Sequence, residues 1–167
     1  SKGLLMDLLL SGGYSISGVI LLNLSRIIND KLLLYKFSNV KEIVEDKNAG
    51  TGAVQCGTYI ASGLVIAGAV HGTGGGFHTV LAFYALGQAV LILFARIYNL
   101  MTPYDIHDEI EKDNVAAGVG LGGALTAIGL ILLHASKGNF IGWQENLSVF
   151  FGEALIALIL LPLARLC

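Results

Sequence analysis

Two stretches of this chain are copies of one another: Lys41–Ala67 reads KEIVEDKNAGTGAVQCGTYIASGLVIA, and His107–Leu133 reads HDEIEKDNVAAGVGLGGALTAIGLILL, at a constant offset of 66 residues. Each copy is a short charged segment, then an asparagine (Asn48 or Asn114), then a long Gly/Ala-rich apolar run. The aligned glycines are Gly52, Gly57 and Gly63 in the first copy and Gly118, Gly123 and Gly129 in the second. A repeat of this kind determines the architecture before any single motif does.

The composition is typical of a membrane protein. Charged residues make up 13% of the 167 and hydrophobic residues 54%, with a mean hydropathy of +0.73; a soluble domain is roughly 25% charged. Such a chain has too few polar residues to cover its apolar surface, so we expect the lipid bilayer as its solvent. The net charge of −2 gives no electrostatic support for nucleic-acid binding. Cys56 and Cys167 have neither a disulfide framework nor a metal-ligand spacing, and no cofactor is indicated.

Five segments qualify, or nearly qualify, as membrane spans, which take about 20 mostly apolar residues each. They are Leu8–Ile28, Ala49–Val70, Phe77–Ala95, Val115–Leu133 and Leu147–Leu163. We predict an all-α fold, a polytopic transmembrane bundle of about five spans in tandem two-span repeats, each with an interfacial amphipathic helix. The expected boundaries are residues 1–76 for the first repeat, 77–138 for the second, and 139–167 for a fifth span that starts a third. Arg165-Leu166-Cys167 resembles the start of another unit, so the natural chain is expected to continue.

The basic residues predict the orientation. With five spans, 8 of the 10 Lys and Arg residues fall on one side, and only Lys2 and Lys137 fall on the other. The positive-inside rule places the rich side in the cytoplasm, so we expect an N-terminus outside the bacterial inner membrane.

Each of the two cytoplasmic loops is predicted to hold a short interfacial helix with a polar outer face. Apolar residues have helical spacing at Val40, Ile43 and Val44 and again at Ile106 and Ile110. In the second loop, Pro103 would start the helix, with Thr102 or Asp105 as its cap. Asn48 and Asn114 are predicted to cap the Gly-rich spans that follow, because an Asn side chain accepts a hydrogen bond from a free backbone N–H.

The segment Asp108–Gly118, DEIEKDNVAAG, followed by a Gly-rich span, resembles the DUF350 family of small bacterial inner-membrane proteins, the YjfL-like group. The first copy matches more loosely, since Asn48–Gly52 reads NAGTG. The resemblance covers roughly residues 12–135. It implies an inner-membrane location and a helical topology with two copies per four spans. The family's function is unknown, so the resemblance assigns no catalytic residue.

The glycines of the second and fourth spans are predicted to pack helices together. Gly52 and Gly63 are 11 residues apart, about three turns, and so share a helix face, as do Gly118 and Gly129. Gly118 and Gly122 also form a GxxxG motif, which allows close approach of two helices. The alternative is a groove for a partner or a lipid. The predicted packing residues are Gly52, Gly57, Gly63, Gly118, Gly122, Gly123 and Gly129.

Glu153 is the carboxylate that lies clearly inside a predicted span, and such a residue is a candidate functional group. Its expected partner is Gln88 or His78, which would form an intramembrane polar site. The alternative is a hydrated carboxylate near the outer interface. His71, His78 and His134 lie near the outer ends of spans, but their spacing matches no metal motif, and no metal site is predicted.

The leading hypothesis is a non-enzymatic membrane subunit that packs through its Gly/Ala-rich helices and anchors or scaffolds partners. The expected partners are the bilayer and either further copies in a homo-oligomer or a larger membrane complex. The alternative is an oligomeric channel or transporter of ions or small solutes that uses Glu153 and Gln88. No activated nucleophile, metal set or acid–base pair is visible, so an enzyme is not expected.

Overall fold

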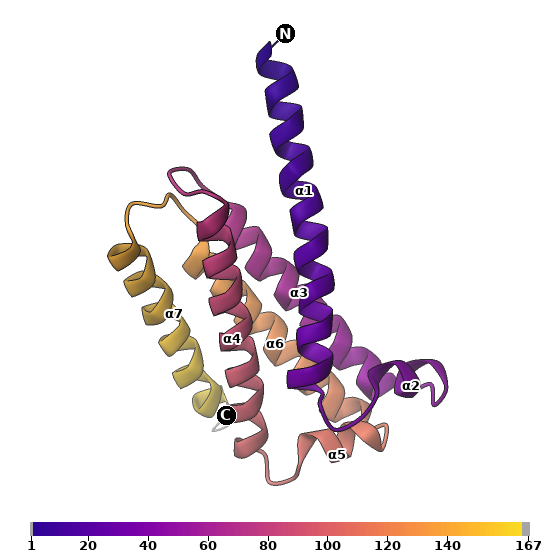
Figure 1. Cartoon of the computed structure of the whole chain (residues 1–167). Coiled ribbons are helices and arrows are strands. Elements are labelled where there is room, and N and C mark those ends of the chain that lie inside the picture. The colour runs from indigo at the N-terminus through magenta and orange to yellow at the C-terminus, as the bar shows by residue number, and fades with distance from the viewer. Residues whose placement is uncertain (1, 165–167) are drawn as a thin grey trace.

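The computed structural model describes residues 2–164, with side chains described for residues 3–160, and within this range all of the secondary-structure elements are helices (Figure 1). The elements are α1 (Lys2–Ile28), a π-helical turn η1 (Asn29–Leu33), α2 (Asn39–Val44), α3 (Ala49–Val70), α4 (Phe77–Met101), α5 (Ile106–Glu111), α6 (Val115–Ser136) and α7 (Trp143–Ala164). Residues 165–167, on which the predicted start of a third unit rests, lie outside the described residues.

Four helices of the described chain are long and apolar enough to cross a membrane: Gly3–Leu33, Ala49–Val70, Phe77–Met101 and Val115–Ser136. The expected fifth span falls on α7, which is a helix but is not among these four. Gln144, Glu145, Asn146 and Glu153 lower the hydropathy of its described part. Four spans are therefore supported, and the fifth stays a prediction.

The Gly-rich helices α3 and α6 form the centre of the bundle and make its most extensive helix–helix contact. Val54 and Ala61 of α3 and Leu121 and Leu125 of α6 are fully buried or nearly so. Helix α1 packs on α3, α4 contacts both central helices, and α7 packs on α6 and α4. Small residues let the two central backbones approach closely, which is how membrane helices gain packing energy without a hydrophobic driving force.

The N-terminal half of α1 has almost no protein neighbours. Every residue from 3 to 16 is exposed, and Figure 1 shows this part of the helix extending past the bundle. Its leucines would be unfavourable in water but suit contact with lipid chains.

The short helices α2 and α5 lie at the same end of the bundle (Figure 1). In α5 the apolar residues Ile106 and Ile110 are fully buried, as a polar outer face requires. The same prediction is wrong for α2: Asn39 and Glu42 are buried, whereas Val40, Ile43 and Val44 are exposed by 40–69%. The sequence pattern predicts the apolar stripe but not the side of α2 that faces the protein. In the structure, the buried polar residues of α2 face the capped end of α3.

At the start of α5 the structure confirms Asp105, one of the two expected caps, whereas the expected role of Pro103 as the first helical residue is wrong. Asp105 is the N-cap, and its Oδ1 accepts a hydrogen bond from the His107 backbone N–H at 3.0 Å. Pro103 lies in the turn before the helix rather than at its first position. Its ring fixes the backbone there, and the Thr102 hydroxyl closes the turn by donating to the carbonyl oxygens of Asn99 and Tyr104.

Candidate functional site

A cluster of polar residues lies at the end of the bundle that holds α2 and α5. Asn48 is the N-cap of α3 and accepts from the Thr51 N–H at 2.7 Å. Asn114 is the N-cap of α6 and accepts from the Ala117 N–H at 3.2 Å. Each asparagine thus satisfies a backbone donor that has no partner inside its own helix.

The two cap turns have the same internal geometry. Lys47 and Asp113, the residues before the two asparagines, have positive φ angles of 55° and 58°. Each cap asparagine also donates through Nδ2 to a glutamate of the preceding short helix, Glu42 at 2.9 Å and Glu109 at 3.0 Å. The two aligned stretches of sequence therefore fold in the same way at this point.

The two turns also bind each other. Asn48 Nδ2 donates to the Ile110 carbonyl oxygen at 2.8 Å and contacts that of Glu111 at 3.2 Å. In return, Asp113 Oδ1 accepts from the Gly50 N–H at 3.0 Å. Asn48 is 3% exposed, so its amide joins both turns from inside the protein.

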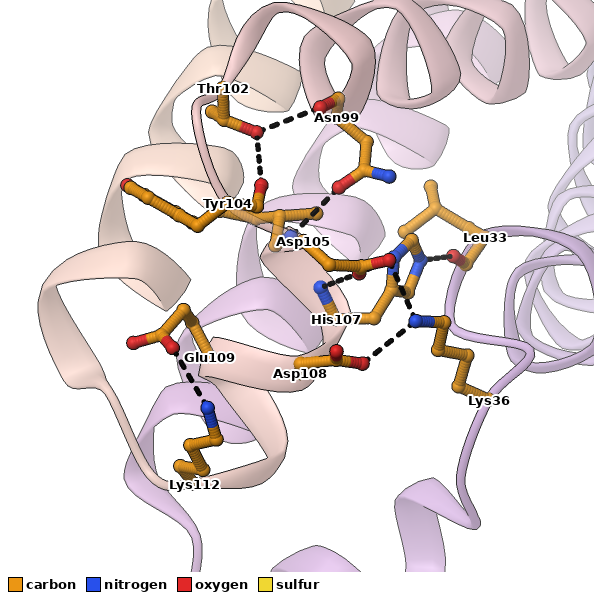
Figure 2. Close-up of polar contacts among 11 residues, drawn as sticks. Leu33, Lys36, Asn99, Thr102, Tyr104, Asp105, His107, Asp108, Glu109 and Lys112 are labelled. Carbon is orange, nitrogen blue, oxygen red and sulfur yellow. Dashed lines mark hydrogen bonds and ion pairs between the residues drawn. The ribbon is translucent and has the colours of Figure 1, made fainter.

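A second polar cluster ties the segment after η1 to α5 (Figure 2). Lys36 Nζ lies 2.7 Å from both Asp105 Oδ2 and Asp108 Oδ1, and Figure 2 shows the ammonium between the two carboxylates. The buried His107 ring donates from Nε2 to the Leu33 carbonyl oxygen at 2.8 Å. The cluster thus fixes the first loop against the second.

Arg96 of α4 braces the same segment. Its guanidinium lies 4.2 Å from the centroid of the Tyr35 ring and donates to the Leu32 carbonyl oxygen at 3.0 Å. Tyr35 in turn meets the His107 ring edge-on at a centroid distance of 5.0 Å. Such cation–π and edge contacts favour one position of the loop over others.

Acid is expected to loosen this end of the protein. The hydrogen bond from Lys36 lowers the pKa of Asp105, and the bonds from Asn114 and Lys112 lower the pKa of Glu109. The pKa of Lys36 is raised in turn, first by the hydrogen bonds that its ammonium donates to the carboxylates of Asp105 and Asp108. A lowered carboxyl pKa stabilises the fold above its unfolded value of about 4, and this stabilisation is lost as the pH falls through the folded value. The raised pKa of Lys36 gives a stabilisation that is fully present below about pH 10 and is lost only above it, so it adds no pH dependence between pH 3 and pH 9.

The measurement is the thermal unfolding midpoint in detergent between pH 3 and pH 9. We expect a plateau above about pH 5 and a fall below it. Lys36→Gln should lower the plateau by at most about 3 °C, because the groups are partly exposed, and should make the acid-dependent fall smaller. An unchanged acid profile in Lys36→Gln would contradict this assignment.

Four of the seven predicted packing glycines lie in the α3–α6 contact. A Cβ atom on Gly57 would overlap the Gly122 backbone, and one on Gly118 would overlap the Gly50 backbone. A Cβ on Gly122 would lie 2.6 Å from the Ala53 carbonyl oxygen, and one on Gly129 would lie 2.7 Å from the Ala61 Cα. These positions admit no side chain without a shift of the helices.

The other three glycines, Gly52, Gly63 and Gly123, are not in that contact. A Cβ atom added to any of them would meet no atom within 4 Å. Each aligned pair therefore has one member in the contact and one facing open space. The prediction that all seven glycines pack within the chain is wrong for these three. The reason is that α3 and α6 meet through faces that do not correspond to each other in the repeat alignment.

Glu153 and Gln88, predicted to share one polar site, lie in different networks. Glu153 of α7 pairs with His134, the last-turn histidine of α6, at 2.9 Å between Oε2 and Nδ1. His134 is exposed. Gln88 is 3% exposed and accepts through Oε1 from the Ser62 hydroxyl at 3.5 Å. The partner expected for Glu153 was wrong because the sequence does not show which turn of α6 meets α7.

A row of polar side chains, which we call the polar seam, joins α1, η1, α2, α3 and α4, and from the sequence only Gln55 and Gln88 are expected to form hydrogen bonds between helices. Asn29 donates to Ser62 at 3.3 Å, and the hydroxyls of Ser25 and Tyr84 lie 3.0 Å apart. The members of the polar seam are Ser25, Asn29, Asp30, Asn39, Gln55, Ser62, Tyr84 and Gln88. The available signal was the number of amide and hydroxyl side chains in otherwise apolar helices, where each needs a partner.

The seam also reaches the loop end. Asp30 Oδ1 accepts from Asn39 Nδ2 at 2.7 Å and from Gln55 Nε2 at 2.8 Å. Both amides are 5% exposed, and their carbonyl oxygens have no hydrogen-bond partner. Among the described residues, no group of three or more His, Cys, Asp or Glu side chains is placed to hold a metal ion.

Two regions of the chain, residues 1–70 and 73–167, match the family model described as Domain of Unknown Function (DUF350). The chain is also similar to the UPF0719 transmembrane protein YshE of Bacillus subtilis, with 32% identity over 69 residues. That match covers 38% of this chain and 52% of the relative, so the chain spans about half the length of the relative. No solved structure matches the chain.

Proposed function

The chain belongs to the DUF350 family, whose function is unknown, and from this premise we propose that it is a non-enzymatic membrane subunit that assembles with copies of itself and scaffolds partners. The family and the transmembrane relative support a protein embedded in the membrane. The bacterial inner membrane, five spans and an external N-terminus are the finer parts of the proposal. The loop end would then face the cytoplasm.

The observation that carries the proposal is the pairing of unlike faces in the α3–α6 contact. The packed face of α3 holds Gly50, Val54, Gly57 and Ala61, and all four are buried. On α6 the packed positions are Gly118, Gly122, Gly129 and Leu133. In the repeat alignment, with its offset of 66, these α6 residues correspond to Gly52, Cys56, Gly63 and Ala67 of α3. None of these four is among the α3 residues that pack on α6.

On each of the two helices, the face that corresponds in the repeat alignment to the packed face of the other helix is exposed or partly exposed; we call these the open faces. On α6 the residues 66 positions after the packed α3 face are Ala116, Gly120, Gly123 and Ala127, and all four are exposed. The Tyr98 hydroxyl lies beside Gly120 at the edge of this face. On α3, Gly52 and Gly63 have open space above them, and Cys56 and Ala67 are exposed.

Both open faces consist mainly of small residues, so a second copy can pack on them much as α3 packs on α6, at a wider spacing where Cys56 stands in the place of Gly122. The open face of α6 in one copy would pack on the open face of α3 in the next. A contact between unlike faces closes into a ring or continues as an open array. Such an assembly of small-residue helices supports a scaffold that holds several loop ends side by side.

The alternative, an oligomeric channel or transporter that uses Glu153 and Gln88, has weaker support. It needs the two side chains to border one path, whereas one pairs with His134 and the other lies in the polar seam. Ion flux through liposomes that is lost in Glu153→Gln would favour this alternative.

Disulfide crosslinking tests the proposed contact between copies. In the repeat alignment, Gly57 corresponds to Gly123 and Gly122 corresponds to Cys56. The internal contact of Gly57 with Gly122 therefore has its counterpart in a contact of Gly123 of one copy with Cys56 of the next. We expect Gly123→Cys, in a Cys167→Ser background, to form dimers and higher oligomers in the membrane under mild oxidation. Helices that pack through small residues can bring two facing cysteines to the Cα separation of about 4.4–6.8 Å that a disulfide needs.

The matched control is Ala89→Cys, which places an exposed cysteine on α4, outside both open faces. It should give no more crosslinking than Cys56 alone. Equal crosslinking of both variants, or none in Gly123→Cys together with a monomeric particle in mild detergent, would overturn the proposed self-assembly.

A further inference from the structure

A cavity of about 240 Å³ lies between the end of α1, helix α2 and helix α3. Its polar wall holds Arg26, Asp30, Asn39 and Gln55, with Tyr59 at one side. Its apolar wall is the exposed row of α2, made of Val40, Ile43 and Val44. The cavity is thus amphipathic, with charged groups on one side and hydrocarbon on the other.

The polar wall offers one charge of each sign. Arg26 Nε lies 3.9 Å from Asp30 Oδ2, a loose pair with the guanidinium side chain 54% exposed. Asp30 also accepts from both Asn39 and Gln55, which orients the two amides around the carboxylate. A ligand with one negative and one positive group would supply a counterion to each of the two charges of this wall.

The two amides add acceptors without partners. Asn39 and Gln55 line the cavity, both are 5% exposed, and neither carbonyl oxygen has a hydrogen bond within the protein. Buried oxygens of this kind are costly unless a donor reaches them. Rotation of either amide about its last side-chain bond would give up its N–H bond to Asp30 and turn its oxygen toward a ligand group that carries several N–H donors.

The cavity continues along the helices toward the middle of the membrane. A neighbouring space of about 350 Å³ shares Arg26 and Tyr59 and extends one helical turn along α1 to Leu22 and Asn23. Arg26 and Asp30 lie where the apolar span of α1 gives way to the charged loop. This is the depth at which lipid headgroups meet lipid chains.

We propose that this cavity binds a phospholipid whose headgroup carries a phosphate and a primary ammonium, the phosphoethanolamine class. The phosphate lies on Arg26 and the Tyr59 hydroxyl, and the ammonium lies on Asp30 and the amide oxygens of Asn39 and Gln55. The glycerol and acyl chains follow the space beside Leu22, and the α2 row covers the headgroup from the side. A trimethylated choline headgroup lacks N–H donors, and an anionic headgroup without an amine offers no cation to Asp30.

The test is lipid retention by the purified full chain, measured by native mass spectrometry from nanodiscs that contain equal amounts of three lipids. These are phosphatidylethanolamine, phosphatidylcholine and phosphatidylglycerol with identical acyl chains. The wild type should retain phosphatidylethanolamine about fivefold over either competitor, which corresponds to about 1 kcal/mol. Equal retention, or a preference for another lipid, overturns the proposal without any variant.

Two variants locate the site. Asp30→Asn should abolish the preference over phosphatidylcholine, and Arg26→Gln should lower retention of all three lipids. Asp7→Asn, an acidic position at the far end of α1, is the matched control and should behave as the wild type. An unchanged preference in Asp30→Asn, with helicity retained by circular dichroism, overturns the assignment. Soluble glycerophosphoethanolamine that binds as tightly as the lipid would make the occupant a free zwitterion and overturn the lipid assignment.

Discussion

Gly118→Leu is expected to destabilise the fold of the single chain by about 3 kcal/mol or more, whereas Gly52→Leu, at the aligned position of the first copy, should change the stability of the single chain by less than about 0.5 kcal/mol. A side chain at Gly118 would overlap the Gly50 backbone, which unlike a flexible side chain has no other rotamer to adopt. The two central helices would have to separate along their whole contact. At Gly52 nothing lies within 4 Å of an added Cβ atom.

The measurement is unfolding in mixed micelles with rising denaturing detergent, followed by far-UV circular dichroism. A second aligned pair gives an independent comparison, because Gly57 meets the Gly122 backbone and Gly123 faces open space. Gly57→Leu should therefore behave like Gly118→Leu, and Gly123→Leu like Gly52→Leu. Similar losses in both members of a pair would mean that the two helices pack through equivalent faces after all.

The different surroundings of the aligned glycines could not be predicted from the sequence. The repeat, the Gly-rich runs and the cap asparagines are local patterns, and the helices Ala49–Val70 and Val115–Ser136 begin at the residues after Asn48 and Asn114. The spacing of Gly52 and Gly63 does place them on one face. It does not say which face points inward, since lipid and protein interior are equally apolar and hydropathy differs little between them.

The errors at polar residues have a related cause. Helix α2 carries an apolar row, but Asn39 and Glu42 have specific partners in Asp30 and Asn48, and these bonds turn the row outward. Glu153 pairs with His134 because α7 packs beside the last turn of α6, a long-range contact that no local spacing encodes. The partners of buried polar groups were thus the least predictable part of the candidate site.

Asn48→Ala is expected to cost about 2–4 kcal/mol, more than Asn114→Ala at about 1 kcal/mol, although the two residues cap their helices in the same way. Both variants lose an N-cap and a hydrogen bond to a glutamate, Glu42 or Glu109. Only Asn48 also donates to the carbonyl oxygens of the other cap turn, at Ile110 and Glu111. Its removal takes one donor from each of these two carbonyl oxygens, of which that of Ile110 keeps the Asp113 N–H at 3.0 Å, and breaks the link between the two cap turns.

Asn48→Asp separates the cap from these donated bonds. An aspartate keeps the acceptor for the Thr51 N–H but loses both N–H donors and brings a second carboxylate beside Glu42. We expect a loss close to that of Asn48→Ala at pH 7, and a partial recovery near pH 5, where one proton shared by the two carboxylates restores a donor. Wild-type stability of Asn48→Asp at pH 7 would show that the cap alone matters. The observed bonds predict instead that the Asn48 amide holds the two cap turns together, and with them the end of the bundle that holds α2 and α5.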